Sequence, residues 1–313
     1  MMKIILANPR GFCAGVNMAI DVVDQVLTNR GAPVYVYHEI VHNRHVVEDF
    51  QDRGVVFVND VSEVPEGSVV VYSAHGISPA VRRTARERQL IEVDATCPLV
   101  HKVHNEVRRY ARDGYTIIFI GHRDHDEAVG TVGEAPESII VVESPEEVER
   151  LEVPDPNMLA FVTQTTLSLS DAAAITAALK KKFPNIRQPD KEDICYATTN
   201  RQAAVNDYSP EADVVLVVGS QNSSNSRRLV ETAHLQGKAA YLIDDESELD
   251  PAWLEGKETV LITAGASAPE HLVQNLIERL RREHGATVET RTLVQEDISF
   301  ELPKSVRSLT VLA

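Results

Sequence analysis

The sequence is short of cysteine, of basic residues and of long apolar runs. Its only cysteines are Cys13, Cys97 and Cys195, and an odd, sparse set of this kind excludes a secreted disulfide framework. Lysine plus arginine number 31 against 47 aspartate plus glutamate, and the net charge of −16 argues against nucleic acid or an anionic membrane as a partner. No apolar run approaches the ~20 residues of a membrane helix. The stretch Ile4–Ala7 is too short for a signal-peptide core, so we expect a cytoplasmic protein with reduced thiols.

Two missing motifs narrow the function further. No Gly-x-Gly-x-x-Gly pattern stands at a strand-to-helix turn, so a dinucleotide dehydrogenase is not expected. No flavin or nicotinamide motif is evident either, and a redox reaction would therefore need an external electron donor. The composition, 43% apolar and 25% charged, is that of a globular protein with a sizeable core, and 313 residues make two domains the default.

What the sequence does contain is a threefold repeat, visible when the chain is cut at its cysteines. Each cysteine precedes a helical pattern and then an apolar run typical of a strand buried on both faces. Polar loops follow these runs, with His42, His125 and Ser223 placed 29, 28 and 28 residues after their cysteines. Further strands are predicted in each segment. The predicted strands are 34–37, 55–58 and 69–72, then 116–120, 139–142 and 159–162, then 214–218, 240–243 and 260–263.

Each third strand runs into a small polar loop and a helix start, near Ser78, Ser170 and Ser267. Because ligands of parallel sheets bind beyond the carboxyl ends of the strands, we predict an α/β fold of three pseudo-symmetric lobes in a trefoil-like arrangement around a common centre. The lobes are residues 13–96, 97–194 and 195–284. Residues 1–12 are expected to form a strand and a loop near the centre, packing with the third lobe, and 285–313 a C-terminal tail. Independent domains, or a chance α/β texture, are the alternatives.

The three cysteines can form a metal centre. Each lies near a predicted helix start, where the helix dipole favours the thiolate. A structural zinc would want a fourth protein ligand, whereas a [4Fe–4S] cluster held by three cysteines leaves one iron without a protein ligand. A single buried cysteine is more often a small core residue, but the shared position in three repeats favours a metal.

Polar residues at the strand ends indicate an anion site. Imidazole, hydroxyl and amide donors suit phosphate or diphosphate, and Ser267 is expected at a helix start. These donors are His42, His75, His125, Ser223, Ser224, Asn225 and Ser267. Glu127 is an acid beside them, which is awkward near an anion unless it transfers protons, and Thr165 is a candidate relay. Surface or capping roles are expected for His38, His45, His101, His104, His122, His234, His271 and His284.

Seven motifs run through these positions: RGFCAGV (10–16), IVHN (40–43), SAHG (73–76), DATCP (94–98), TQTTLS (163–168), DICYATTNRQ (193–202) and GSQNSSNS (219–226). Together they closely resemble the 4-hydroxy-3-methylbut-2-enyl diphosphate reductase (LytB) family over nearly the whole chain. The resemblance implies three lobes around a central [4Fe–4S] cluster bound by Cys13, Cys97 and Cys195. It also implies a diphosphate site formed by the seven donors, with Glu127 as proton donor and Thr165 and His125 beside it.

The reaction implied by the resemblance is the reductive dehydroxylation of the allylic diphosphate to isopentenyl and dimethylallyl diphosphate, the last step of the methylerythritol phosphate route to isoprenoids. It takes two electrons and two protons, and the donor is of ferredoxin or flavodoxin type. The chain departs from the family where proline is usual and glycine frequent, at Asp126 and Asp124. We expect a more acidic and more flexible loop there, with an altered proton-transfer pKa.

Two other functions stay open: a zinc-dependent hydrolase, and an iron–sulfur sensor or nucleic-acid regulator, against which the net charge of −16 argues. Seven arginines in two predicted helices form a hypothetical docking face for the electron donor, with solvated helix faces as the alternative. They are Arg82, Arg83, Arg86, Arg88, Arg108, Arg109 and Arg112.

Overall fold

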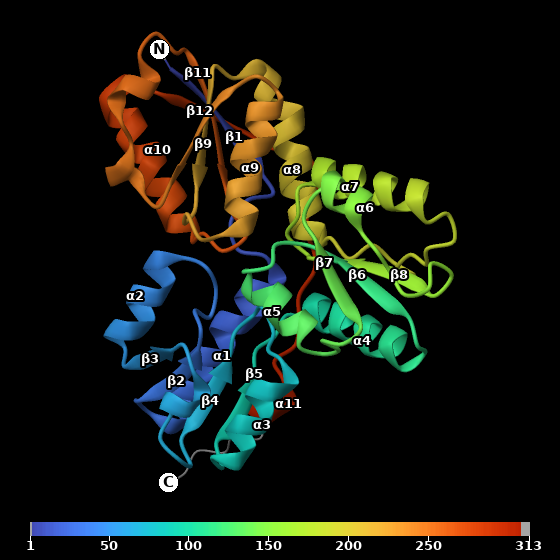
Figure 1. Cartoon of the computed structure of the whole chain (residues 1–313). Coiled ribbons are helices and arrows are strands. Elements are labelled where there is room, and N and C mark those ends of the chain that lie inside the picture. The colour runs from blue at the N-terminus through green and yellow to red at the C-terminus, as the bar shows by residue number, and fades with distance from the viewer. Residues whose placement is uncertain (1, 308–313) are drawn as a thin grey trace. The chain divides into compact units, whose positions relative to one another are not determined.

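The computed structural model describes residues 2–307, and its strands form three parallel sheets flanked by helices (Figure 1). This confirms the predicted α/β fold class. Packing divides the described chain into two compact units. Unit 1 holds residues 2–16, 42–49 and 196–298, and unit 2 holds residues 17–41, 50–195 and 299–307. Over the described residues, no helix has both the length and the apolar character needed to cross a bilayer.

Unit 1 contains a sheet in the order β10-β9-β11-β1-β12. Its strands are β1 (Lys3–Asn8), β9 (Val214–Val218), β10 (Ala239–Ile243), β11 (Thr259–Ala264) and β12 (Thr287–Thr292). Side chains alternate between the two faces, as the pleat requires: Ile4 packs with α10 (Glu270–His284), and Ile5 packs with α8 (Tyr196–Tyr208) and α9 (Ser224–Leu235). The central strands of the sheet are therefore covered on both faces, whereas the edge strand β12 is polar and largely exposed.

Unit 2 contains two smaller sheets, in the orders β3-β2-β4-β5 and β7-β6-β8. The first has β2 (Val34–Tyr37), β3 (Val55–Val58), β4 (Val69–Tyr72) and β5 (Ile91–Asp94). The second has β6 (Thr116–Ile120), β7 (Ile139–Val142) and β8 (Leu159–Thr163). The helices of unit 2 are α3 (Pro79–Glu87), α4 (Pro98–Arg112), α5 (Asp126–Val132), α6 (Pro145–Arg150), α7 (Leu169–Lys182) and α11 (Lys304–Arg307). Helices α1 (Ala14–Arg30) and α2 (Arg44–Asp52) run from unit 1 into unit 2 along the chain.

The second sheet of unit 2 has two separate apolar layers. Ile118 and Phe161 pack with α6 and α7, whereas Ile117 and Phe119 pack with α4 and α5. Both layers consist of fully or nearly fully buried side chains. A strand buried on both faces needs a continuous apolar run, and this explains why 116–120 reads as a strand in the sequence.

Every strand predicted from the three segments forms, some of them one or two residues longer. Helix α3 follows its N-cap Ser78 as predicted, while α7 begins at Leu169, with Ser168 as its N-cap. The third helix starts at the end of the predicted stretch 267–269: α10 begins at Glu270 with Pro269 as its N-cap, so Ser267 precedes the helix and does not cap it. The turn at 265–268, closed by a backbone hydrogen bond from Ala268 to Gly265, delays this helix.

The sheets draw on the predicted segments unequally. The two sheets of unit 2 use strands from 13–96 and from 97–194 respectively, but the unit 1 sheet adds β1 and β12 to strands from 195–284. Strand β1 lies between β11 and β12, paired in parallel with both. The trefoil-like arrangement and the lobe boundaries at the cysteines remain predictions, and residues 308–313 of the predicted tail lie outside the described residues.

Candidate active site

Each cysteine stands immediately before a helix, as the sequence predicts: Cys13 before α1, Cys97 as the N-cap of α4 and Cys195 before α8. The backbone N–H of each donates to a carbonyl in the loop that follows a strand, β11, β4 or β8. These bonds join Cys13 to Ala266 (3.1 Å), Cys97 to Ala74 (3.0 Å) and Cys195 to Thr165 (3.0 Å). Each bond lies within one unit, and each places a thiol next to a loop that the sequence marks as polar.

The thiols have the chemistry that an iron–sulfur cluster requires. All three are partly exposed and outside any disulfide, and the Cys97 side chain is not used as a helix cap. Free N–H groups at a helix start favour the thiolate, which is the form that binds metal. The donor set therefore fits a group ligated by cysteine.

A buried acid lies in the first turn of α5 in unit 2. The Glu127 side chain is 1% exposed, and Thr165 donates to both of its oxygens, from the backbone N–H to Oε1 (2.7 Å) and from Oγ1 to Oε2 (2.8 Å). Burial raises the pKa of Glu127 to about 7; the hydrogen bonds from Thr165 oppose this rise and the charge of Asp193 adds to it. A carboxyl group with this pKa can hold a proton at neutral pH and release it. The carbonyl of Thr165 also accepts the backbone N–H of Cys195. Hydrogen bonds through Thr165 therefore connect the Glu127 acid with the residue that carries the thiol.

Two histidines extend this group. His125 is the N-cap of α5, and its Nδ1 accepts the N–H of Glu127 at 3.1 Å. A backbone N–H can only donate, so a neutral His125 carries its proton on Nε2. The His75 ring stands edge-on to the His125 ring, with centroids 5.9 Å apart. Unit 2 thus brings together Cys97, His75, His125, Glu127, Thr165 and Cys195.

The two unusual acids beside Glu127 have different surroundings. Asp124 is exposed, whereas Asp126 is the first residue of α5 and its Oδ1 lies 2.7 Å from Nδ1 of His38. The hydrogen bond that His38 donates to Asp126 raises the pKa of His38, against the effect of its partial burial. Asp126 therefore belongs to a helix start and an ion pair, and His38 has a partner that the sequence analysis did not assign.

Unit 1 holds a group of buried hydroxyls at the start of α9. Ser223 is the N-cap, and its Oγ accepts the backbone N–H of Ser226 at 3.3 Å. The Oγ of Ser267 lies 3.4 Å from Oγ of Ser223 and donates to the carbonyl of His42 at 2.8 Å. Ser224, in the first turn of the helix, is also buried. The backbone N–H of Cys13 donates to the carbonyl of Ala266, the residue before Ser267, so this group of hydroxyls lies next to the Cys13 loop.

Asn225, in the same helix turn, has a polar side chain that the protein leaves unsatisfied. It is 4% exposed, and both its Oδ1 and Nδ2 are buried without a hydrogen-bond partner among the described residues. An unsatisfied buried polar group costs about 1–3 kcal/mol, so natural proteins keep one chiefly where it has a use. A buried amide at a helix N-terminus, beside Ser223 and Ser224, is suited to an anion.

Two side chains anchor the loops of the site although their sequence patterns did not indicate this role. Arg201 on α8 is fully buried and donates to the carbonyl of Gly11 (2.8 Å) and to Glu296 (3.0 Å), which fixes the loop before Cys13. Asp193 accepts the N–H of Thr163 at 2.9 Å. Both residues lie in the 193–202 motif, and that position is their only signal in the sequence.

The arginines proposed for docking differ in their surroundings. Arg82, Arg83, Arg86 and Arg108 line a hollow of about 550 Å³ in unit 2. Arg82 is held inward by Asp94 at 2.7 Å, whereas Arg83 is exposed. Thr96, the neighbour of Cys97, also lines the hollow. Arg88, Arg109 and Arg112 are not among its lining residues.

One histidine expected at the surface is in the interior. The His104 side chain is 3% exposed, and its Nδ1 lies 2.8 Å from Glu134, which also binds Arg108 at 2.7 Å. The expectation of a surface or capping role for His104 is therefore wrong. An acidic partner 30 residues away along the chain makes the burial possible, and helical periodicity cannot reveal such a partner.

Comparison with known proteins gives consistent results. The sequence profile of the family described as "LytB protein" matches residues 4–281. The chain is 55% identical over 307 residues to the 4-hydroxy-3-methylbut-2-enyl diphosphate reductase of Rhodopirellula baltica, covering 98% of this chain and 96% of that one. It is 53% identical over 308 residues to the reductase of the same name from Nocardia farcinica, covering 98% and 91%.

Solved structures agree with these relatives. The E-1-hydroxy-2-methyl-but-2-enyl-4-diphosphate reductase of Plasmodium falciparum is similar with a TM-score of 0.95 at 40% identity, covering 98% of this chain and 97% of that one. A second solved reductase, described as the terminal enzyme of the non-mevalonate pathway, has a TM-score of 0.64 at 31% identity. That comparison covers 90% of this chain and 100% of the other.

Proposed function

The chain belongs to the LytB protein family, and from this premise we propose that it is a 4-hydroxy-3-methylbut-2-enyl diphosphate reductase. It is an enzyme of the oxidoreductase class. In the proposed reaction the allylic C–O bond breaks and the oxygen leaves as water after taking up one proton. Two electrons enter the carbon skeleton, and a second proton completes the new C–H bond of isopentenyl or dimethylallyl diphosphate. The observation that carries the proposal is the buried Glu127–Thr165 pair, an acid protonated near neutral pH in a family that removes a hydroxyl group.

We propose that Cys13, Cys97 and Cys195 are the ligands of a [4Fe–4S] cluster. The support is their equivalent attachment to three loops and their positions at helix starts. When bound, such a cluster supplies electrons and one iron open to the substrate oxygen. The residues that bind, orient and protonate the substrate are the chain's own.

Binding of the diphosphate is assigned to the neutral donors of unit 1 and to three histidines. Ser223, Ser224, Asn225 and Ser267 offer hydroxyl and amide donors at or near the start of α9, whose dipole favours an anion. His42, His75 and His125 are proposed as additional donors. Asn225 supports this assignment most directly, since its amide finds no hydrogen-bond partner among residues 2–307.

Proton delivery follows from the two hydrogen bonds between Glu127 and Thr165. When Glu127 is ionised, the Thr165 hydroxyl donates to Oε2. When Oε2 carries a proton, the bond reverses, because the acid now donates to Oγ1 of Thr165. The hydroxyl proton of Thr165 is then directed away from the acid. A proton can therefore pass from Glu127 through Thr165 to the leaving oxygen.

Electrons are proposed to come from an acidic protein of ferredoxin or flavodoxin type that docks at the arginine-lined hollow of unit 2. The exposed Arg83 and Arg86 are suited to such a partner, and the hollow reaches Thr96, the residue before Cys97. Arg82 is already paired with Asp94, so its first role is structural. We propose a cytoplasmic location, where thiols stay reduced.

Anaerobic purification followed by iron and sulfide analysis, and by an assay with the allylic diphosphate and a chemical reductant, tests the proposal. We expect a brown protein with about four irons per chain that consumes the substrate. A colourless protein loaded with zinc would contradict the cluster and favour a hydrolase. An intact cluster without turnover would contradict the reductase and favour a sensor.

A further inference from the structure

The segments that lead to the three cysteines are fixed in different ways. Before Cys97, strand β5 is paired with β4 over four successive residues, and before Cys13, strand β1 is paired on both sides. Before Cys195 there is no such strand among the described residues, only an isolated bridge between Ala160 and Arg187. Residues 188–194 continue without strand pairing to the cysteine. Something other than a sheet must therefore fix this approach.

Side chains of α4 bind the unpaired segment along its length. The hydroxyl of Tyr110 donates to the carbonyl of Gln188 at 3.2 Å, and Arg109 pairs with Asp190 at 3.0 Å. Nearest the cysteine, the Lys102 ammonium makes three short contacts. They reach the carbonyl of Lys191 (2.7 Å), the carbonyl of Glu192 (3.0 Å) and Oδ1 of Asp193 (2.8 Å).

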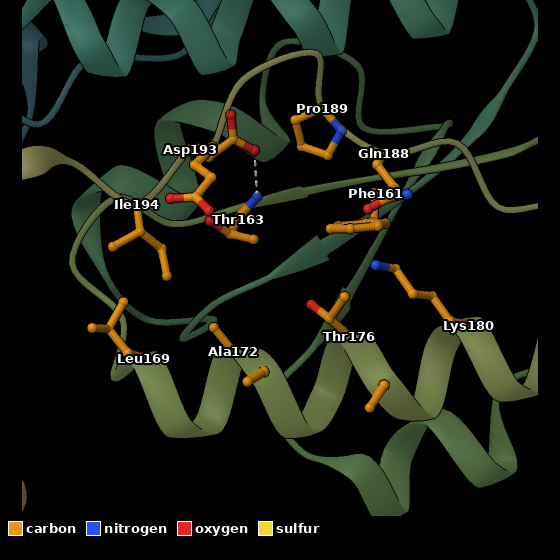
Figure 2. Close-up of a pocket in the computed structure, with 13 residues that line it drawn as sticks. Phe161, Thr163, Leu169, Ala172, Thr176, Lys180, Gln188, Pro189, Asp193 and Ile194 are labelled. Atoms are coloured by element: carbon orange, nitrogen blue, oxygen red, sulfur yellow. Dashed lines mark hydrogen bonds between the residues drawn. The ribbon is translucent and has the colours of Figure 1, made fainter. Parts of the chain in front are cut away.

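Asp193 connects Lys102 to the sheet through the two oxygens of its carboxylate. Its side chain is fully buried, and Oδ2 accepts the N–H of Thr163, the last residue of β8 (Figure 2). Two residues later, the N–H of Cys195 donates to Thr165, just beyond the same strand. An ammonium has three donors on a compact head, which matches three acceptors at successive residues. Lys102 thus links α4, whose N-cap is Cys97, to the loop that ends at Cys195.

We infer that Lys102 is a positioning residue for the metal centre. Lys102 holds the Cys195 loop in place, just as strand pairing holds the segments that lead to Cys97 and Cys13. This inference rests on the proposed cluster. Lys102 acts through the carbonyls of Lys191 and Glu192 and the carboxylate of Asp193. Residues outside the ligand shell that orient the ligands typically change metal affinity by about 10–100-fold.

Unit 2 provides a matched control. Lys182 on α7 also donates to three carbonyl oxygens of a neighbouring segment, those of Val148 (3.0 Å), Glu149 (2.8 Å) and Leu151 (2.7 Å). That segment leads to no cysteine. Lys182→Met therefore removes an equivalent clamp from the same unit without disturbing an approach to a thiol, and a general loss of stability would affect both variants.

The test compares Lys102→Met with Lys182→Met after reconstitution with iron and sulfide, at a temperature where near-UV circular dichroism shows both folded. We expect iron to be lost to a chelator about 10-fold faster from Lys102→Met than from wild type, with altered electron paramagnetic resonance of the reduced cluster. Lys182→Met should match wild type. Equal iron loss from the two variants would overturn the inference. If Lys102→Met does not fold, Lys102→Arg and Lys182→Arg, which keep the charge, make the same comparison.

Hydrogen exchange on the protein without iron separates this inference from the proposed function. Lys102→Met should exchange the amides of residues 191–195 faster, whereas Lys182→Met should not. Unchanged exchange in that segment would overturn the clamp whatever the protein binds. Faster exchange in a chain whose wild type takes up no cluster would instead contradict the proposed function and leave the clamp standing.

Discussion

The residues assigned to the substrate differ in kind between the two units. Unit 2 contributes groups that can gain or lose a proton, Glu127 and the imidazoles of His75 and His125. Unit 1 contributes mainly hydroxyls and an amide that stay neutral across the physiological range, at the start of α9. A neutral site binds an anion at any of these pH values, whereas a titrating site changes with pH. The comparison indicates that binding depends chiefly on unit 1 and proton transfer on unit 2, and each half can be tested separately.

The largest effect is expected from Glu127→Gln. The amide keeps the shape and the contact to Thr165 but has no acidic proton to transfer, so kcat should fall at least about 100-fold. Iron content and the Kd for the substrate should stay near those of wild type, measured by metal analysis and by titration. Turnover close to wild type would show that the acid lies elsewhere.

The pH dependence should have the same origin. Burial raises the pKa of Glu127 to about 7, and the acid form is the donor, so kcat should fall about tenfold per pH unit above that value.

The same carboxyl group, with a folded-state pKa above its unfolded value, contributes stability that is present below about pH 4.3 and lost as the pH rises through about 7. The free energy of unfolding should therefore decline between about pH 4.3 and about pH 7 in wild type, and less so in Glu127→Gln. A flat rate profile from about pH 6 to 9 would remove Glu127 from this role.

In unit 1, Asn225→Ala should act on binding. Losing a hydrogen bond to a charged group costs about 1.5–3 kcal/mol, so KM should rise about tenfold or more, with a smaller change in kcat. Because the amide has no hydrogen-bond partner in the part of the chain that the structure describes, the free energy of unfolding should not fall. The exposed Asn206, which accepts a hydrogen bond from Gln236, provides Asn206→Ala as the control with unchanged KM. A fall in kcat alone would contradict the division between the units.

A smaller effect is expected from Arg83→Glu combined with Arg86→Glu. Loss of steering should slow the reaction driven by an acidic protein donor a few-fold at low salt and less at high salt. A small chemical reductant does not use the docking face, so the rate with it should not change. Arg112→Glu, at a side chain that is 76% exposed and outside the hollow, is the control. An unchanged donor-driven rate and salt dependence would place docking elsewhere.

The smallest effect should come from Asp126→Asn. Asp126 raises the pKa of His38, so their pair contributes stability below the unfolded pKa of about 6.5 and loses it as the pH rises through the folded value. Both side chains are about a quarter exposed, and solvent screening limits the contribution to about 1 kcal/mol or less. Denaturant unfolding at about pH 6 should detect the loss, and at about pH 9 the variant should match wild type. An equal loss at both values would mean that the ion pair is not the cause.

The sequence was most informative where one physical signal dominates. A strand buried on both faces needs a continuous apolar run, so 116–120 and 214–218 could be predicted to the residue. Features that depend on distant partners could not. Nothing in the local sequence indicates that Glu134 buries His104, that the 265–268 turn delays α10 past Ser267, or that Lys102 reaches 90 residues along the chain. The site residues came from motifs, and their contacts required the structure.

The position of β1 has a consequence for how the chain folds. Residues 3–6 pair with 259–262, and residues 3–8 pair with 287–292. The first strand therefore has no sheet to join until most of the chain has been synthesised. Contacts this distant in sequence form slowly because a long loop must close first. The two sheets of unit 2 use residues 34–163 only and can form earlier. The loop that carries Cys13 is therefore ordered late, and a metal centre that needs this thiol cannot be completed before then.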